Sequence, residues 1–492
     1  MVHQHKFQRH QLRHAGICPR KTILLCALCA ASIAHAAPPP MMAPASNGQS
    51  SNEGLFDFLD GINRSSSLLG NMWGLRGWLS RYGVVLAVEE TDESLGNITG
   101  GTKTGSAADG LTQILLQMDT QRAMGHYGGL FNLSLLNLHG NNLGASNLQS
   151  LQTASGIEGN PGTRLWEMWY DQKFLDEDRL DIKAGQISVD QEFMVSNNAL
   201  YFINTASGWP MLPSADLPGG GPAYPLSALG LRLSSRPVNG TQILAGVFNG
   251  SPTQRQIGNP QQLDPHGDSF PWGGGVLAIM EAQFSYPALG SMVEPGENTD
   301  LGWTYRIGAW YDSRSFADQR WDTQGLSLNN PANNGQPIQH QGDYAVYAVA
   351  DHLFWRNQGN PNQTLAWFAR IMGTPLADRN LVNYSANAGF VLHSPFIYRA
   401  PDTFGISVDY AHISPDAAAL NADGNLYGTA QTVRSAETVY EMTYQYQLRP
   451  WIQLQPDVQY VINPGAGVTN PYLTGERIGN EWVVGLRTNI SF

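Results

Sequence analysis

The chain has 492 residues and is acidic, with 28 Lys and Arg against 40 Asp and Glu, a net charge of −12 and a mean hydropathy of −0.26. This acidic balance makes nucleic acid a poor partner, because phosphate binding requires a basic surface. Beyond the N-terminal segment no stretch reaches the roughly 18 apolar residues of a membrane helix, so only a transmembrane β-barrel remains open among membrane proteins.

Residues 1–36 have the pattern of a secretory signal peptide. Five basic residues and no acidic one accompany an apolar run from Thr22 to Ala34, which ends in Ala34-His35-Ala36. We therefore expect cleavage near Ala36. A buried N-terminal helix is the alternative, but it would not explain the basic cluster. All three cysteines lie in this segment, so the mature chain would have no thiol and a net charge of about −17.

Residues 37–79 are expected to form a flexible lead and a short helical segment. The stretch from Ala37 to about Gly54 is rich in Pro, Ser and Asn and lacks periodicity. Residues 55–79 mix apolar and polar positions and predict one or two short helices on the periplasmic side or at a barrel mouth. A core helix of a separate domain is the alternative, although the segment is too short to bury a domain core.

Alternation with a period of two begins after Ser80 and predicts that residues 80–492 form an all-β domain. Residues 481–492 show it clearly and end in an aromatic residue, Phe492, as in the last strand of outer-membrane barrels, which pairs with the first strand. We expect a transmembrane antiparallel β-barrel of about sixteen strands, over residues 81–90, 112–119, 128–138, 164–175, 179–188, 228–235, 241–248, 276–285, 302–311, 343–353, 363–371, 385–392, 403–412, 437–448, 450–460 and 480–492.

The expected strands have one apolar, aromatic face and one polar face. In a membrane barrel the apolar face points outward, and Tyr and Trp near strand ends suit interfacial girdles, although burial in a core is the alternative for each one. Candidate girdle residues are Trp166, Tyr170, Trp310, Tyr311, Tyr347, Trp367, Tyr410, Trp451 and Trp482. Long connections are expected at about 189–227, 249–275, 312–342 and 413–436, and one of them folding inward would narrow the pore.

Catalytic, metal-binding and cofactor-binding patterns are weak. No G-x-S-x-G, H-E-x-x-H, Walker or dinucleotide pattern is present, and the seven histidines beyond residue 36 are scattered. Their spacing favours pore, loop or girdle roles over metal binding. The stretch Asn421–Asn425 faintly resembles a calcium loop but lacks the downstream Glu, so a surface turn is preferred. We expect no cofactor and no metal.

Charges on the predicted inward faces form the candidate solute site, because charged residues facing lipid would be costly. Mixed Arg, acids and aromatics can hydrogen-bond to hydroxyls and stack on the apolar faces of sugars. The alternative is that they merely solvate a wide lumen. The candidates are Arg164, Glu167, Trp169, Asp171, Lys173, Lys183, Arg232, Arg306, Arg370, Glu441 and Arg487.

Several stretches between about Trp78 and Phe492 match one known family in the same order. They include Trp169–Phe174, Leu180–Gln186, Phe202–Asn204, Gly208–Pro210, Pro218–Pro225, Val247–Gly250, Gln453–Tyr460, Asn463–Gly465 and Val484–Arg487. Through these stretches the chain resembles the carbohydrate-selective porins of the OprB type. The resemblance implies a sixteen-stranded outer-membrane barrel that passes glucose and related sugars by diffusion through an arginine-containing constriction.

The function expected is therefore that of an exported outer-membrane porin, not an enzyme, that conducts glucose-like sugars passively. A general or organic-acid-selective porin is the first alternative, and an outer-membrane hydrolase or a non-conducting structural barrel is less favoured. Expected partners are sugars, outer-membrane lipid and lipopolysaccharide, and the barrel-assembly machinery, which would read the strand that ends at Phe492; nucleic acid is not expected.

Overall fold

A computed structural model of the chain describes residues 66–253, 258–287 and 301–492. The expected signal peptide, the flexible lead and the first part of the expected helical segment lie outside these residues. Within the described part, no helix is both long and apolar enough to cross a membrane.

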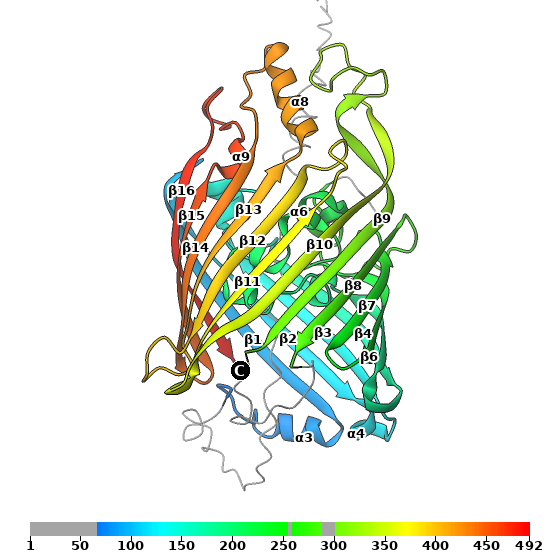
Figure 1. The fold of residues 1–492 in the computed structure, drawn as a ribbon, viewed down its shortest axis with the longest axis vertical. Coiled ribbons are helices and arrows are strands. Elements are labelled where there is room, and N and C mark those ends of the chain that lie inside the picture. The colour runs from blue at the N-terminus through cyan, green and yellow to red at the C-terminus, as the bar shows by residue number, and fades with distance from the viewer. Residues whose placement is uncertain (1–65, 254–257, 288–300) are drawn as a thin grey trace, which may run out of the picture.

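Sixteen antiparallel strands close into a barrel, so the expected fold class is confirmed (Figure 1). Each strand pairs with its neighbours in sequence, and β1 closes the ring by pairing with β16. The strands are β1 Val84–Gly101, β2 Gly105–Asp119, β3 Gly129–Gly140, β4 Gly162–Phe174, β5 Leu180–Ile187, β6 Ala228–Val238, β7 Thr241–Asn249, β8 Val276–Tyr286, β9 Trp303–Asp322, β10 Pro337–Asn357, β11 Asn360–Gly373, β12 Val382–His393, β13 Thr403–Ile413, β14 Ala436–Arg449, β15 Ile452–Ile462 and β16 Gly479–Ser491.

The apolar face of each strand points away from the lumen. On β14, Tyr440 and Met442 are about half exposed, at 50% and 49%, whereas Glu441 between them is 2% exposed. Successive side chains of a strand point to opposite faces, so the barrel is apolar outside and polar inside. A soluble barrel would show the reverse arrangement, and the pattern is that of a transmembrane barrel.

The predicted long loop at 312–342 is wrong for most of its length. Strand β9 continues to Asp322 and β10 begins at Pro337, so only residues 323–336 connect them. Strands β1 and β2 likewise extend to Gly101 and from Gly105. In these extensions the backbone pairing continues, but apolar and polar residues no longer alternate clearly. The alternation therefore predicts strands that end too early.

The described α-helices are short. They are α3 Leu75–Arg81, α4 Thr120–Met124, α5 Thr205–Gly208, α6 Met211–Asp216, α7 Pro260–Leu263, α8 Pro415–Leu426 and α9 Pro464–Gly467. The surface turn predicted at Asn421–Asn425 is wrong, because this stretch lies inside α8. Ser414 caps that helix by accepting a hydrogen bond from the Ala417 N–H, and Pro415 occupies its first turn, where a missing N–H costs nothing.

Three of the nine candidate girdle aromatics lie inside the barrel instead. Trp166, Trp310 and Tyr347 are buried, at 6%, 2% and 3% exposure. Trp310 and Tyr347 pack in a cluster with Phe193, which belongs to a segment folded into the lumen. The sequence does not show that apolar segments of the chain fill the lumen. An aromatic side chain that packs against such a segment therefore cannot be distinguished in sequence from one that faces lipid.

Helix α3 and the C-terminus lie at the same end of the barrel (Figure 1). Arg76 in α3 donates hydrogen bonds to the Leu86 carbonyl of β1 at 3.2 Å and to the Phe492 carbonyl at the end of β16. The Leu68 N–H donates to the Ser491 carbonyl at 2.7 Å. The chain that precedes the barrel therefore covers one end of the seam between the first and last strands.

Candidate functional site

Two connections fold into the lumen, where Figure 1 shows short helices enclosed by the strands. They are residues 141–161, between β3 and β4, and residues 188–227, between β5 and β6; we call them the first and second inserted segments. Phe193, Trp209 and Met211 of the second segment pack in one buried cluster with Tyr347 and Met372 of the wall. The segments are thus packed against the barrel as part of its core.

Carboxylates of β14 hold both inserted segments by their backbone. Glu437 accepts hydrogen bonds from the N–H groups of residues 151 and 152, each at 2.8 Å. Glu441, a sequence candidate, accepts from the N–H groups of Ile203 and Asn204 at 2.6 and 3.0 Å. Backbone groups that leave water need such partners, so these acids have a structural task.

Carboxylates on other strands anchor the second inserted segment in the same way. Asp351 of β10 accepts a hydrogen bond from the Ser196 hydroxyl at 2.6 Å, and Glu281 of β8 accepts one from the Met194 N–H at 2.9 Å. The candidate Arg306 donates to Asp351 at 2.8 Å through Nη1. Arg306 therefore stabilises an anchor of the segment.

Arg370 of β11 is the most heavily used anchor. It donates to the carbonyls of Met194 at 3.2 Å, Ala206 at 2.5 Å, Ser207 at 2.7 Å and Gly208 at 2.8 Å. Its Nε donates to the Asn387 side chain at 3.0 Å. A guanidinium has five N–H donors, and all five are engaged. No donor of Arg370 is left for a solute while the segment is seated.

A charged and aromatic cluster lies where the second inserted segment leaves the wall. Glu192 of this segment binds Lys183 and accepts a hydrogen bond from the Arg232 Nε at 2.8 Å. The Lys183 Nζ lies 3.8 Å from the centre of the Trp169 ring. Asp181 also contacts Arg232. The fold thus brings together three candidates from β4, β5 and β6, and we call Trp169, Lys183, Glu192 and Arg232 the Lys183 cluster.

Of three other candidates, Arg487 faces the first inserted segment and Glu167 the start of the second, whereas Arg164 is buried in the wall. Arg487 pairs with Glu93 across the barrel seam and lies 3.4 Å from the Ser155 hydroxyl. Glu167 accepts a hydrogen bond from the Ser188 N–H at 2.9 Å. Arg164 is 1% exposed, and its Nε and Nη1 have no hydrogen-bond partner among the described residues. These three residues lie outside the Lys183 cluster.

Lys173 and Asp171 complete the set of candidates. Lys173 lies near the end of β4 and pairs with Asp178 of the adjacent turn at 3.3 Å, with about half of its side chain exposed. It therefore lies at the barrel rim. Asp171 is partly buried, and its cross-strand neighbour on β5 is Lys183. Asp171 thus borders the Lys183 cluster.

Burial raises the pKa of two carboxyl groups of the second inserted segment, those of Asp190 and Asp216. Asp190 accepts hydrogen bonds from the Ser188 hydroxyl at 2.5 Å and from the Tyr224 N–H at 3.0 Å. Burial nevertheless raises the pKa of Asp190 to about 6, because a low dielectric disfavours the charged form. Protonation of this group therefore favours the seated segment.

The sequence did not point to Glu192, Glu281, Asp351 or Glu437. Glu281, Asp351 and Glu437 do lie on inward positions of predicted strands, so strand alternation offered a signal for them. Glu192 lies in a connection without periodicity, and no sequence pattern shows that this connection turns inward.

Comparisons with known proteins agree with this architecture. The family model described as "Carbohydrate-selective porin, OprB family" matches residues 103–492. Porin B of Pseudomonas aeruginosa is 23% identical over 459 residues, which cover 87% of this chain and 92% of the relative.

Among solved structures, the high-pH structure of Pseudomonas putida OprB superposes with a TM-score of 0.75 at 21% identity. It covers 87% of this chain and 99% of that one. The low-pH structure of the same protein matches with a TM-score of 0.52 at 17% identity and the same coverage. At these identities the structural matches support the fold alone.

Proposed function

The chain belongs to the OprB family of carbohydrate-selective porins, and from this premise we propose that it passes glucose-like sugars by passive diffusion through a constriction formed by its inserted segments. Family membership and the closed barrel place the protein in the bacterial outer membrane. The matched relatives are porins, which are channels and not enzymes.

The observation that carries the proposal is that five of the candidate cations facing the lumen are paired within the protein, whereas Arg164 has no partner at Nε and Nη1 among the described residues. Lys183 and Arg232 bind Glu192, Arg306 binds Asp351, and Arg487 binds Glu93. The donors of Arg370 are occupied by carbonyl groups and Asn387, as described above. A pore selective for anions needs unpaired positive charge, whereas a polar lumen with matched charges suits a neutral polyhydroxyl solute.

The Lys183 cluster is the proposed contact for the sugar. Glu192 is partly exposed and offers carboxylate acceptors to hydroxyls, whereas Lys183, which binds it, and Trp169, which packs against Lys183, are 8% and 7% exposed. Glu192 belongs to an inserted segment and Lys183 to the wall, and the two are bonded to each other, so a solute at this point would contact the junction between the segment and the wall. Binding that is weak enough to allow release is what conduction requires.

The experiment is conductance of the purified protein in a planar bilayer, titrated with glucose, other sugars and organic acids. We expect saturable block by sugars and weak ion selectivity. Conductance that sugars leave unchanged, combined with an anion-selective reversal potential, would instead establish the organic-acid alternative. A folded protein without conductance would reject both porin proposals.

Two variants locate the contact. Trp169→Leu and Glu192→Gln are expected to weaken sugar block by about tenfold, the usual effect of losing one good polar or stacking contact. The matched control is Lys173→Ala, which removes a charge from the same wall at the rim and is expected to leave block unchanged. Equal effects of all three variants would remove the Lys183 cluster from the proposal.

We also propose that residues 1–36 are removed on export. The outward apolar face would contact lipid and lipopolysaccharide, and the assembly machinery would bind the strand that ends at Phe492. The apolar, outward residues of β16 support the last proposal, because this terminal amphipathic strand would have a free edge for pairing with another sheet until it pairs with β1.

A further inference from the structure

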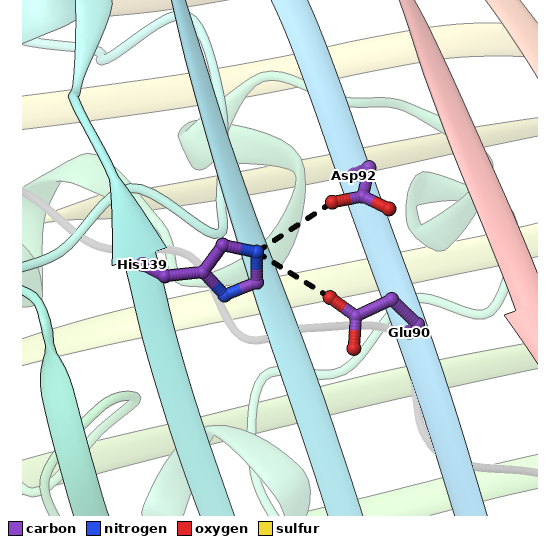
Figure 2. Close-up of side chains that lie close together, drawn as sticks. All are labelled: Glu90, Asp92 and His139. Atoms are coloured by element: carbon purple, nitrogen blue, oxygen red, sulfur yellow. Dashed lines mark ion pairs between the residues drawn. The ribbon is translucent and has the colours of Figure 1, made fainter.

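A cluster of metal-ligating side chains lies on the outer wall of the barrel, away from the lumen (Figure 2). It consists of Glu90 and Asp92 on β1 and His139 on β3, and the ligand atoms of the three residues all lie within 4.8 Å of one another. The His139 Nε2 lies 3.5 Å from Glu90 Oε1 and 3.6 Å from Asp92 Oδ1.

Strand register places this cluster outside the barrel. Asp92 pairs with Gly110 on β2, and Gly110 pairs with His139. The next residue on β2, Leu111, and its partner Leu138 are fully buried in a lumen cluster. Because side chains alternate between faces, Asp92 and His139 point outward. Their side chains are 56% and 45% exposed.

Gly110 makes the contact across β2 possible. A Cβ at this position would lie 2.4 Å from the His139 Nε2 and 2.8 Å from Asp92 Oδ1, closer than real atoms approach. The imidazole instead crosses the bare backbone of β2, as Figure 2 shows, and reaches the two carboxylates of β1. Two carboxylates and one imidazole therefore meet at a point that only glycine leaves open.

The electrostatics of the cluster are unbalanced without a cation. Glu90 and Asp92 lie two residues apart on one strand, and the ion pairs recorded for them in the described chain involve His139 and no Lys or Arg. Their neighbours across the β1–β16 ladder are Ile490 and Thr488, on the outward face of the last strand. Two carboxylates on such a face are costly, and one divalent cation would cancel their charge.

We propose that Glu90, Asp92 and His139 bind a zinc-like divalent cation on the outer wall of the barrel. Zinc bonds of about 2.0–2.1 Å at tetrahedral angles place neighbouring donor atoms about 3.4 Å apart, close to the observed separations from the His139 Nε2. An imidazole nitrogen favours zinc and similar transition metals over Mg²⁺ and Ca²⁺, which prefer oxygen ligands. Three protein ligands leave the fourth position to water.

The site does not depend on sugar transport. The cluster belongs to the opposite face of the wall from the Lys183 cluster, so loss of either function leaves the other measurable. The sequence alone offered no such site, because His139 is 47 positions from Asp92 and only the sheet brings them together.

The test is titration of the metal-free, detergent-purified protein with Zn²⁺ by calorimetry, with Mg²⁺ as comparison. The protein is used without residues 1–36, because the three cysteines and five histidines of that segment are themselves zinc ligands. We expect one equivalent of Zn²⁺ to bind and no competition from Mg²⁺. His139→Asn and Glu90→Gln are expected to weaken binding at least about tenfold. The matched control His412→Asn changes an exposed-face histidine of β13 that hydrogen-bonds Asn383 and is expected to bind like the parent.

Gly110→Ala tests the geometry with all three ligands retained, and it is also expected to weaken binding at least tenfold. Folding of each variant is checked by the heat-dependent shift of barrels in gel electrophoresis. A second readout needs no variant: Co²⁺ in the parent protein is expected to give the strong visible absorption of tetrahedral coordination. Unchanged Zn²⁺ affinity in folded His139→Asn, or an octahedral Co²⁺ spectrum with equal Mg²⁺ binding, would overturn the proposal.

Discussion

Individual charges inside this barrel serve mainly as backbone partners. Glu441 accepts two N–H groups of the second inserted segment, and Arg370 donates to four of its carbonyls. An unsatisfied backbone group inside a protein costs about 1–3 kcal/mol, so the segment cannot stay in place without such partners. A charged residue on the inward face of a strand can therefore indicate an inserted segment as well as a solute-binding site.

The pH dependence of stability at Asp190 tests whether buried carboxyl groups act mainly as hydrogen-bond partners of the inserted segment. Its pKa is raised from 3.8 to about 6 in the folded protein. Stability from its neutral form is therefore fully present below pH 3.8 and lost as the pH rises through about 6. We expect Asp190→Asn to be about as stable as the parent at pH 4 and more stable by up to about 3 kcal/mol at pH 7.

The measurement is urea unfolding of the detergent-folded protein at the two pH values. Asn can keep both contacts, since the Ser188 hydroxyl can accept as well as donate. Asp176→Asn, at an exposed position in the turn after β4, controls for the lost charge. An Asp190→Asn variant that is less stable at pH 7 than at pH 4, relative to the parent, would contradict the expectation.

The candidate site was predictable in part. Alternation placed the eleven candidates on strands or at their ends, and ten of them proved to be buried or partly buried. Alternation places both Arg370 and Lys183 on inward positions of strands. It does not show that Arg370 binds backbone carbonyls of the second inserted segment whereas Lys183 binds a carboxylate. Glu192 comes from an aperiodic connection and could not be found at all.

At the scale of elements, the second inserted segment depends on a few wall residues. Arg370→Met would remove five hydrogen bonds; the Ala206 carbonyl would keep the Asn387 side chain as a donor, whereas the carbonyls of Met194, Ser207 and Gly208 would lose the guanidinium. We expect the folded barrel to lose at least about 3 kcal/mol of stability and to show larger, noisier single-channel conductance, because the segment loosens. Single-channel recording and urea unfolding check the two effects.

The control for this change is Arg449→Met, which makes the same replacement at the exposed last residue of β14. Conductance of the control is expected to match the parent. A channel of unchanged conductance in Arg370→Met would mean that the segment is held without this residue.

All sixteen strands were predictable from the sequence. Each strand faces lipid on one side and water or an inserted segment on the other, so apolar and polar side chains alternate along it. Strand ends were less predictable where the outer face leaves the apolar zone, as at Gly101 and Asp322. Trp310 was assigned to the wrong face, since an aromatic residue suits lipid and a packed lumen equally well.

For the whole molecule, Arg76 joins three parts of the chain. It bonds to the segment before α3, to β1 and to the end of β16. We expect Arg76→Ala to destabilise the barrel by about 1–3 kcal/mol, because the seam loses its cover at one end. Thermal unfolding in detergent measures this, and Arg122→Ala in α4, at an exposed position away from the seam, is the control. Equal melting temperatures for parent and Arg76→Ala would show that the cover is dispensable.

The seam between β1 and β16 also sets the order of events in folding. It contains contacts such as Thr91 with Asn489, 398 positions apart in the chain. Bringing such distant residues together costs about 5 kcal/mol of loop-closure entropy, which the many hydrogen bonds of one long ladder offset only once they form together. We therefore expect pairing of β1 with β16 to be the late and slow step of folding. Until it occurs, the sheet has two free edges, and other β-strands in the membrane can pair with them.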